Sequence, residues 1–406
     1  MRPVIFVAPY FLEATLRFVD AVSRLDEVAV AVVSTDPEEK LPPGLRSRVL
    51  AHWRVGDCLD PAQIELAVRG LARRIGPPAR LIGTLEELQV PLALAREALG
   101  LPGLSSEAAS NFRDKARMKT ALARAGLPCA RHALAHSEEE ARAFVRTVGY
   151  PVVAKPQAGA GAKNTFRLDS EEQLAAACAH MPPNPGSPVL LEEFVTGEEH
   201  SFDAAVVGGV PVWHSISRYH PSPLEVLREP WIQWCVLLPR AIDGPEYAAI
   251  RRDGFAALAA LGLDTGFAHM EWFLRKSGEV AISEVGARPP GAQFTTLISY
   301  AHDADFYQIW ARLAALDQFA PPERKYAVGC AYLRGQGQGR VQQVLGLDRV
   351  AQELGPLVVE ARLPRAGQAS AGTYEGEGFI IVRHPETRVV EEALNTIVSN
   401  IRVELA

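Results

Sequence analysis

The stretch Phe267-Ala-His-Met-Glu-Trp-Phe-Leu-Arg-Lys-Ser-Gly-Glu-Val-Ala-Ile-Ser-Glu-Val285 predicts an antiparallel β-hairpin, because two runs of strand-forming residues flank Ser277–Gly278. Counting back from a two-residue turn places Glu271 directly opposite Glu284, with Cβ atoms ~4.5 to 5.5 Å apart on one face. Two like charges at that spacing repel each other, and a shared divalent cation reverses the sign of the interaction. Oxygen-only ligands suit Mg²⁺ better than zinc, so the hairpin predicts a magnesium site.

The same register makes two further predictions. Phe273 lies opposite Ile282, which gives the carboxylate face an apolar neighbour for a planar base. His269 lies opposite Gly286 on the face of Glu271, where its imidazole can support a phosphate or a metal-bound water. Two alternatives stay open: a slip of one residue produces two solvated glutamates, and His269 as a core histidine bonds a backbone carbonyl.

A glycine-rich loop precedes the hairpin. The apolar run 151–154 ends at Lys155, and the loop Gln-Ala-Gly-Ala-Gly-Ala-Lys-Asn that follows contains Gly159, Gly161 and Lys163. Glycine lets backbone N–H groups approach a phosphate, and a lysine at a strand end adds a point charge. The Walker A pattern GxxxxGK[ST] is absent. Taken alone, the segment equally fits an ordinary glycine hairpin with a solvated lysine.

A second group of acids lies between the glycine loop and the hairpin. Glu192 and Glu199 fall in the strand-like run 190–203, where a carboxylate that faces a core needs a partner. A charged edge strand, which prevents edge-to-edge aggregation, is the alternative interpretation.

Composition narrows the class of protein. The chain has 406 residues, 48% of them hydrophobic and 22% charged, which fits two to three folded soluble domains. A net charge of −6 provides no basic field for nucleic acid or an anionic membrane. Five cysteines without a CxxC pair favour buried thiols, and no apolar run reaches the ~18 residues of a membrane span. We therefore expect a cytoplasmic protein with small-molecule partners.

Patterns along the chain divide it into regions. The opening predicts an α/β domain without a GxGxxG turn, with strands at 4–8, 28–33 and 79–82 and helices at 11–25 and 88–99. A helix from Asn111 through Ala125 leads into a strand-rich α+β block. After Pro322 the chain becomes glycine-rich and then alternates strands with turns up to a final helix near 391–398.

The phosphate-loop lysine, the two acids of segment 190–203 and the hairpin acids followed by Gly286-Ala-Arg288-Pro-Pro-Gly291 together resemble the ATP-grasp superfamily. The resemblance implies an ATP-grasp fold, α/β plus α+β, with an N-terminal Rossmann-like (pre-ATP-grasp) domain and a C-terminal β-rich lobe. It divides the chain into an N-terminal domain at 1–110, subdomain A with the phosphate loop at 111–185, subdomain B with the metal hairpin at 186–322, and a C-terminal lobe at 323–406.

The resemblance also implies roles for individual residues. ATP would be bound by Lys115 and Lys155 at the α- and β-phosphates, by Gly159, Gly161 and Lys163 over the β- and γ-phosphates, by Glu192 and the backbone of Glu193 and Val195 at adenine, and by Glu199 at the ribose. Glu271 and Glu284 would hold Mg²⁺, for which Mn²⁺ can substitute. Arg288 would be the catalytic residue that stabilises an acyl phosphate. The family's third metal ligand, an asparagine two residues after the second glutamate, is Gly286 here, which leaves the number of metal ions open.

The tail after Pro322 looks like that of L-amino acid ligases and related carboxylate-amine ligases. This likeness implies an ATP-dependent, ADP-forming ligase that joins a carboxylic acid to an amine, amino acids among them, through an acyl phosphate, with a homodimer as a possible assembly. Ser283 to Pro290 and Thr296 to Ser299 also resemble formate-dependent glycinamide ribonucleotide transformylases. A nucleotide-binding sensor without turnover is the third alternative, although such a sensor has no need of Arg288.

Overall fold

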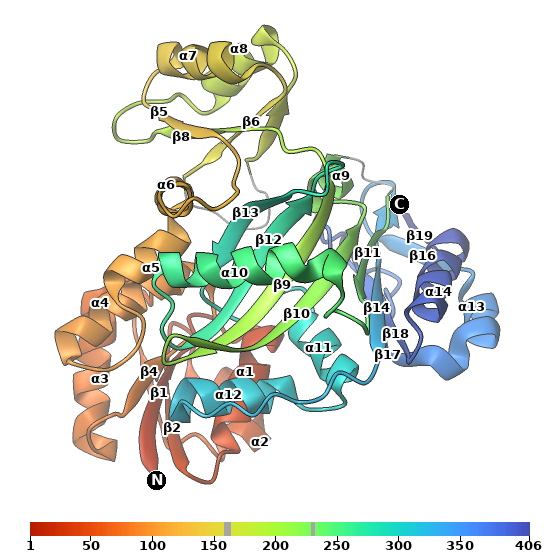
Figure 1. The fold of residues 1–406 in the computed structure, drawn as a ribbon. Coiled ribbons are helices and arrows are strands. Elements are labelled where there is room, and N and C mark those ends of the chain that lie inside the picture. The colour runs from red at the N-terminus through yellow and green to blue at the C-terminus, as the bar shows by residue number, and fades with distance from the viewer. Residues whose placement is uncertain (158–163, 229–231) are drawn as a thin grey trace.

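The computed structural model describes residues 1–157, 164–228 and 232–406. Its chain begins with a parallel sheet of order β3-β2-β1-β4 (Figure 1). The elements are β1 (Arg2–Val7), α1 (Glu13–Ser23), β2 (Val28–Ser34), α2 (Pro43–Arg46), β3 (Ala51–Arg54), α3 (Pro61–Ile75), β4 (Arg80–Ile82), the 3₁₀ turn η2 (Glu86–Leu88) and α4 (Gln89–Leu99). The predicted α/β opening is confirmed, and β3 and α3 add to it. Strand β1 is buried on both faces, as expected for the centre of a parallel sheet.

The predicted helix through Asn111 and Ala125 is two helices, α5 (Ser106–Arg113) and α6 (Lys115–Arg124). Asp114 has an extended backbone and accepts hydrogen bonds from the N–H groups of Ala116 and Arg117. An aspartate that caps a new helix ends the preceding one, so the prediction of one continuous helix was wrong.

A small antiparallel sheet of order β5-β8-β6-β7 stands apart from the rest of the fold (Figure 1). It contains β5 (His132–Ala135), β6 (Val152–Pro156), β7 (Phe166–Leu168) and β8 (Val189–Glu193), and it packs against α7 (Glu138–Val148) and α8 (Glu171–His180). The predicted boundary at 185 separates β8 from this sheet. In the structure β8 belongs to the sheet, because it is hydrogen-bonded to both β5 and β6.

An eight-stranded sheet of order β13-β12-β9-β10-β11-β14-β18-β17 forms the centre of the molecule. Its strands are β9 (Glu198–Val207), β10 (Val210–His220), β11 (Trp234–Leu238), β12 (Gly266–Leu274), β13 (Val280–Gly286), β14 (Ala327–Leu333), β17 (Val358–Arg362) and β18 (Gly378–His384). The sheet runs across the predicted boundary at 322, since β11 pairs with β14. The helices beside it are α9 (Pro223–Arg228), α10 (Ala248–Leu261), α11 (Phe294–His302) and α12 (Phe306–Leu316).

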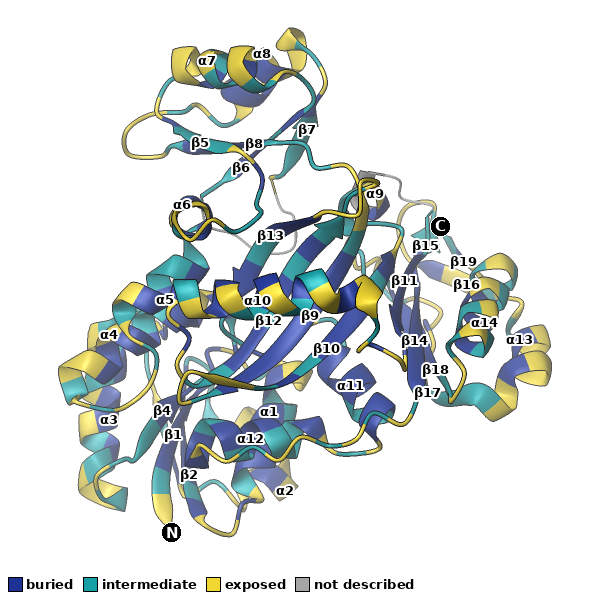
Figure 2. Cartoon of the chain, in the orientation of Figure 1, coloured by how far each residue is buried: buried dark blue, intermediate teal, exposed yellow. Residues whose placement is uncertain are grey.

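The C-terminal part adds a three-stranded sheet of order β15-β19-β16. It consists of β15 (Gly335–Gln336), β16 (Val341–Leu345), α13 (Leu347–Leu354), α14 (Thr387–Asn400) and β19 (Arg402–Leu405). Helix α14 has its buried side on β14 and β18, whereas its outer side is exposed (Figure 2). The predicted β-rich C-terminal lobe with a closing helix is therefore confirmed.

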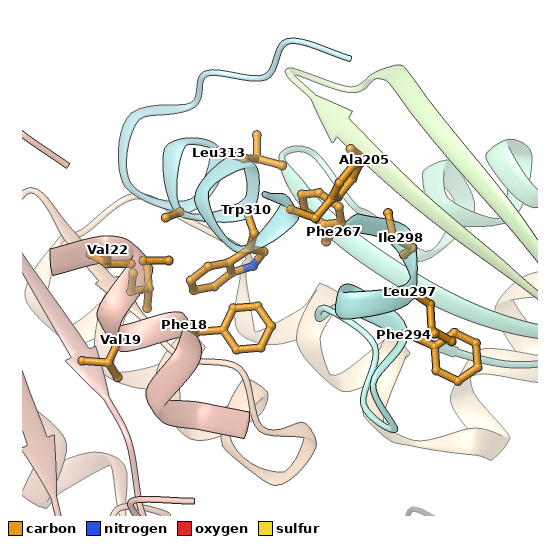
Figure 3. Close-up of a cluster of buried hydrophobic side chains, with 14 of the residues drawn as sticks. Phe18, Val19, Val22, Ala205, Phe267, Phe294, Leu297, Ile298, Trp310 and Leu313 are labelled. Atoms are coloured by element: carbon orange, nitrogen blue, oxygen red, sulfur yellow. The ribbon is translucent and has the colours of Figure 1, made fainter. Parts of the chain in front are cut away.

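An apolar cluster joins the N-terminal domain to the central sheet. Phe18 of α1 packs edge-on against Trp310 of α12 with ring centroids 4.9 Å apart, and Leu297 and Phe267 continue the same cluster (Figure 3). Burial of large side chains on both sides favours one fixed arrangement of the two domains. Side chains from the end of β4 and from the hairpin therefore meet in a defined geometry.

The five cysteines are free thiols, four of them buried and Cys129 half-buried. In the part of the chain that the structure describes, no helix combines the length and the apolar character needed to cross a bilayer.

Candidate active site

A cavity of about 220 Å³ lies where the small sheet faces the hairpin β12–β13. Strands β6 and β8 contribute Lys155 and Glu192 to its wall, and the hairpin contributes Glu271 and Glu284. Every candidate side chain that the structure describes lines this cavity: Lys115, Lys155, Glu192, Glu193, Val195, Glu199, His269, Glu271, Glu284 and Arg288. Gly159, Gly161 and Lys163 lie outside the described residues.

The hairpin pairs Glu271 with Glu284 and His269 with Gly286, as predicted. The turn differs from the prediction: the N–H of Gly278 bonds the carbonyl of Arg275, and Gly278 has φ 84°. This is a three-residue loop with a left-handed glycine, one residue longer than the turn assumed from the sequence.

A β-bulge on β13 compensates for the longer loop. Beyond the turn Trp272 lies opposite Ile282 and Phe273 opposite Ala281, so the predicted pairing of Phe273 with Ile282 was wrong. The extra residue, Ser283, then restores the register at the two glutamates. Both Phe273 and Ile282 nevertheless line the cavity, so the expected apolar neighbour of the acids is present.

The bulge is held by groups from outside the hairpin. The fully buried Lys119 donates from Nζ to the carbonyl of Ser283 at 3.1 Å, and the N–H of Ile282 bonds the carbonyl of Pro128 at 2.8 Å. Lys119 was missed in the sequence, although it lies one helical turn after Lys115 on the same face of α6. It places Glu284 by fixing the bulge.

Electrostatics differ between the two hairpin acids. Burial and the charge of Glu284 raise the pKa of Glu271 above its ordinary value. Burial also acts to raise the pKa of Glu284, but Lys115, 2.7 Å away, and Lys155 outweigh it, so this pKa is lowered. Burial and the charge of Glu271 raise the pKa of Glu199 well above its usual range. The neighbouring cations therefore compensate the charge of Glu284 but not that of Glu271 or Glu199.

Glu192 has the opposite environment. It lies in the hinge, the segment 192–197 in which the chain leaves β8 for β9. Glu192 forms ion pairs with Lys155 at 2.9 Å and with Lys119 at 3.3 Å. Burial acts to raise the pKa of Glu192, but the two ammonium groups outweigh it and lower that pKa. A buried carboxylate between two lysines stays ionised, which excludes the charged edge strand considered from the sequence.

The adjacent residues Glu193 and Val195 differ in their hydrogen bonding. The Glu193 side chain is held by Arg131 at 2.5 Å and by Arg275 at 3.1 Å, and its N–H bonds the carbonyl of Arg131. Val195 lines the cavity, and its N–H has no hydrogen bond to any residue that the structure describes. The backbone of Val195 is thus available to a planar hydrogen-bonding ligand.

Arg288 is paired with Glu86, which comes from η2 at the carboxyl end of β4. The Glu86 carboxylate also fills the space beside Gly286, where a Cβ atom would lie 2.9 Å from its Oε2. Sequence reasoning missed Glu86. Its position just after a strand of a parallel sheet is where such folds place ligand-binding groups, and this was the available signal.

His269 bonds a buried carboxylate. Its Nδ1 lies 2.7 Å from Oδ1 of Asp203, so the backbone-carbonyl partner considered from the sequence was wrong. Burial acts to lower the pKa of His269, but Asp203 outweighs it and raises that pKa. Asp203 fixes the orientation of an imidazole that also lines the cavity.

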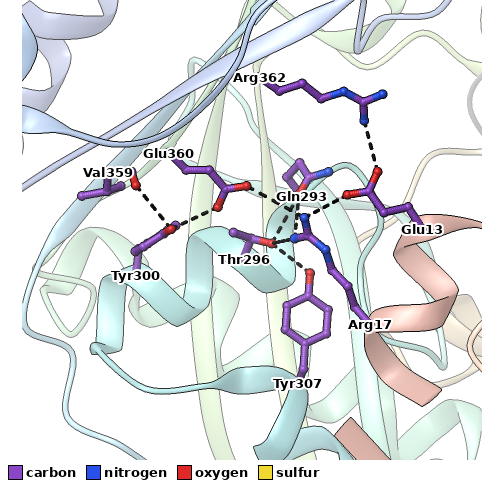
Figure 4. A network of polar contacts seen from close by, with 9 residues as sticks. All are labelled: Glu13, Arg17, Gln293, Thr296, Tyr300, Tyr307, Val359, Glu360 and Arg362. Carbon is purple, nitrogen blue, oxygen red and sulfur yellow. Dashed lines mark hydrogen bonds and ion pairs between the residues drawn. The ribbon is translucent and has the colours of Figure 1, made fainter. Parts of the chain in front are cut away.

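The loop after Arg288 carries two left-handed residues that are not glycine, Ala292 with φ 47° and Gln293 with φ 64°. Such conformations cost about 1–3 kcal/mol each and persist only where the surroundings impose them. Here the hydroxyl of Tyr332 donates to the carbonyl of Ala292. Arg17 donates to Gln293 at 3.5 Å and to Thr296 at 3.0 Å (Figure 4). These contacts hold a loop of which Gly291 and Ala292 line the cavity.

A cluster of four aromatic rings also lines the cavity. Trp234 lies 5.5 Å from Tyr219 and 4.8 Å from Tyr374, measured between ring centroids, and Phe294 lies beside them. All four rings line the cavity. They come from β10, β11, α11 and the segment before β18, a combination that no local sequence pattern indicates.

A family model for the ATP-grasp domain matches residues 120–303. Residues 120–303 of the chain are an ATP-grasp domain. The predicted ATP-grasp fold is thereby confirmed.

One curated relative of this ATP-grasp protein is the L-arginine-specific L-amino acid ligase of Bacillus subtilis. It is 27% identical over 259 residues, which span 61% of this chain and 61% of the relative. The chain therefore spans about three fifths of that relative's length.

Solved ATP-grasp structures cover nearly the whole chain. The L-amino acid ligase from Bacillus licheniformis has a TM-score of 0.80 at 21% identity and covers 100% of this chain and 99% of its own. The biotin carboxylase domain of the Hydrogenobacter thermophilus 2-oxoglutarate carboxylase, solved with MgADP, has a TM-score of 0.68 at 16% identity and covers 99% and 90%. At these identities the likeness establishes the fold alone.

Proposed function

We propose that this ATP-grasp protein is an ATP- and Mg²⁺-dependent carboxylate-amine ligase that forms an amide bond and releases ADP and phosphate. The observation that carries the proposal is the arrangement of charge in one cavity. Glu271 and Glu284 are paired on the hairpin, Lys115 lies 2.7 Å from Glu284, and Lys155 and Arg288 line the same cavity. Cations around an acidic pair suit a triphosphate with its metal at the centre.

In this proposal the nucleotide occupies the hinge end of the cavity. The Val195 N–H and the carboxylate of Glu192 face adenine, Glu199 faces the ribose, and the two lysines face the phosphates. Lys115 is held by Glu284 and Lys155 by Glu192 in the free protein. Each ammonium is thus already placed before a phosphate arrives, which lowers the entropy lost on binding.

The acidic pair fits Mg²⁺. Glu271 and Glu284, paired across the hairpin, would be the protein's contribution to the metal. Mg²⁺ is commonly bound by one or two carboxylates, with phosphate and water completing its shell. When bound, the ion neutralises the charge that develops on the phosphates. Gly286 adds no ligand, and Glu86 occupies the space beside it.

The ligase reaction then takes two steps at the Arg288 end. A carboxylate oxygen attacks the γ-phosphorus, the bond to the β-phosphate oxygen breaks, and ADP leaves. The amine nitrogen attacks the carbonyl carbon of the acyl phosphate, the C–O bond to phosphate breaks, and the nitrogen gives up a proton. Arg288 offers its guanidinium to the negative charge in both steps, and Glu86 keeps it oriented.

A phosphate-release screen tests the proposal. Purified protein receives Mg-ATP with pairs of amino acids, with each amino acid alone, and with formate plus glycinamide ribonucleotide in a separate arm. The ligase predicts ADP and an amide product only when acid and amine are both present. ADP formation in the formate arm alone selects the transformylase, and nucleotide binding without turnover in any arm selects a sensor.

A matched pair of variants controls the screen. Arg288→Lys keeps the charge but loses the planar donors, and should lower product formation strongly. Arg74→Lys, on the exposed end of α3, makes the same chemical change outside the cavity and should leave it unchanged.

A further inference from the structure

A second cavity lies on the other side of Arg288, between the N-terminal domain and the central sheet. Its volume of about 230 Å³ is similar to that of the first. Its walls come from β4, α4 and the loop that follows α4, the start of β12 and α12, so it is a pocket between domains. Nothing in the proposed ligase reaction uses it.

The cavity contains a buried cation without an acidic partner. Arg96 is 8% exposed, and it donates from Nε to the carbonyl of Leu81 at 2.9 Å and from Nη1 to that of Leu104 at 3.1 Å. Among the described residues no carboxylate pairs with it, and burial lowers the pKa of Arg96 to about 10. Its Nη2 has no hydrogen-bond partner there. A buried guanidinium in this state has donors to offer to an anion.

The acids around the cavity do not satisfy Arg96. Asp317 is paired with Arg80, and Asp264, at an exposed position, accepts a hydrogen bond from the Thr265 hydroxyl at 3.1 Å. Both acids therefore have other partners.

The rest of the wall is apolar. Phe267, Trp310 and Leu313 form it on the side of the central sheet, and Leu81 and Ile82 form it on the side of the N-terminal domain. A ligand here needs a negative head for Arg96 and a short apolar body for these side chains.

We propose that this interdomain cavity is a second binding site, for a small monocarboxylate with a branched or aromatic apolar group, its carboxylate on Arg96. Arg288 lines both cavities, so a ligand here lies next to the residue whose guanidinium is paired with Glu86. Binding in one cavity is thus expected to alter affinity in the other, and the effect must be reciprocal.

Isothermal titration calorimetry with 3-methylbutanoate as the probe, without ATP or metal, tests the site independently of any turnover. The wild-type protein should bind it, and should bind the neutral 3-methylbutanamide roughly tenfold more weakly, because the charged hydrogen bonds to Arg96 are lost. Acetate, which lacks the apolar body, should also bind weakly. Absence of 3-methylbutanoate binding, or equal binding of acid and amide, overturns the proposal.

Two variants separate this cavity from the first. Ala314→Phe fills the second cavity alone and should abolish binding, whereas Ala314→Ser keeps the volume and should retain it. Arg96→Gln should weaken binding roughly tenfold, with the exposed Arg74→Gln as the charge-matched control. The Ala314 pair keeps the test valid if loss of Arg96 disturbs the fold. Unchanged binding in Ala314→Phe places the carboxylate in the first cavity and overturns the proposal.

Discussion

Two groups of carboxylates line the same cavity and are treated in opposite ways by the fold. Glu192, in the hinge, is surrounded by two ammonium groups that lower its pKa. Glu271, on the hairpin, faces Glu284 and has a raised pKa. The charge of the first group is balanced by lysines of the protein. The charge of the second group is balanced only when a cation is added. A carboxylate that the fold leaves uncompensated is the better indicator of a ligand.

The largest effect is expected from Glu284→Gln. It removes one carboxylate of the hairpin pair and an ion pair to Lys115, so ADP formation should fall roughly 100-fold or more. Glu271→Gln should be less severe, because Lys115 and Glu284 stay paired. Steady-state ADP release at several Mg²⁺ concentrations measures both. Equal and small losses in the two variants would mean that the two hairpin acids do not hold the metal.

Lys155→Met tests the ion pairs around the buried Glu192. It should lower ATP affinity roughly 10- to 100-fold, since a charge-assisted contact to phosphate is lost. It should also destabilise the protein, because Glu192 then keeps Lys119 alone as a buried partner. Urea denaturation with Lys155→Met, Glu192→Gln and the double variant forms a cycle, in which the double variant should recover part of the stability. Additive losses would mean that the buried pair is not coupled.

Gly286→Asn introduces the asparagine that the resemblance to the ATP-grasp superfamily implies at this position. A Cβ there lies 2.9 Å from the Glu86 carboxylate, so the variant should displace Glu86 from Arg288 and lower turnover, about tenfold. His269→Ala should lower kcat or raise the Mg²⁺ requirement if the imidazole supports the site opposite Gly286. Rescue of His269→Ala by Gly286→Asn in the same assay would contradict the expected loss from Gly286→Asn. It would mean that an asparagine at position 286 can take over the role of the histidine.

The smallest effect is expected from Glu193→Gln. This carboxylate is shared by Arg131 and Arg275 at the rim, where exposed ion pairs contribute about 0.2–1 kcal/mol. Stability and ATP affinity should change less than about threefold, and less still at high salt. A loss as large as that of Lys155→Met would show that rim and buried pairs are equivalent here.

The acidic pair was predicted correctly because two errors in the predicted hairpin register cancelled each other. The turn is one residue longer than a Ser277–Gly278 turn, and the bulge at Ser283 restores the register before the glutamates. A bulge depends on long-range contacts such as the one from Lys119, which strand patterns do not contain. The prediction of Glu271 opposite Glu284 was therefore correct, whereas that of Phe273 opposite Ile282 was not.

Local sequence patterns predicted the fold well where a single helix or strand is sufficient to identify it. Strands β1, β2 and β4 and the final helix α14 followed from local patterns, whereas β3 did not, and the ordered motifs indicated the ATP-grasp fold. The roles of Glu86 and Asp203 could not be assigned in this way, because each acquires its role from a partner far away in the chain, Arg288 and His269. Only the docking of the N-terminal domain and the pairing of β9 with β12 bring them into place.

Nucleotide binding with and without Mg²⁺ tests most directly the claim that the hairpin acids are completed by a cation. The non-hydrolysable analogue AMP-PNP is titrated into the wild-type protein and into the double variant Glu271→Gln/Glu284→Gln by calorimetry, with and without the metal. We predict that Mg²⁺ strengthens binding to the wild-type protein at least tenfold and leaves binding to the double variant unchanged. Equal enhancement by Mg²⁺ in both proteins would contradict the claim.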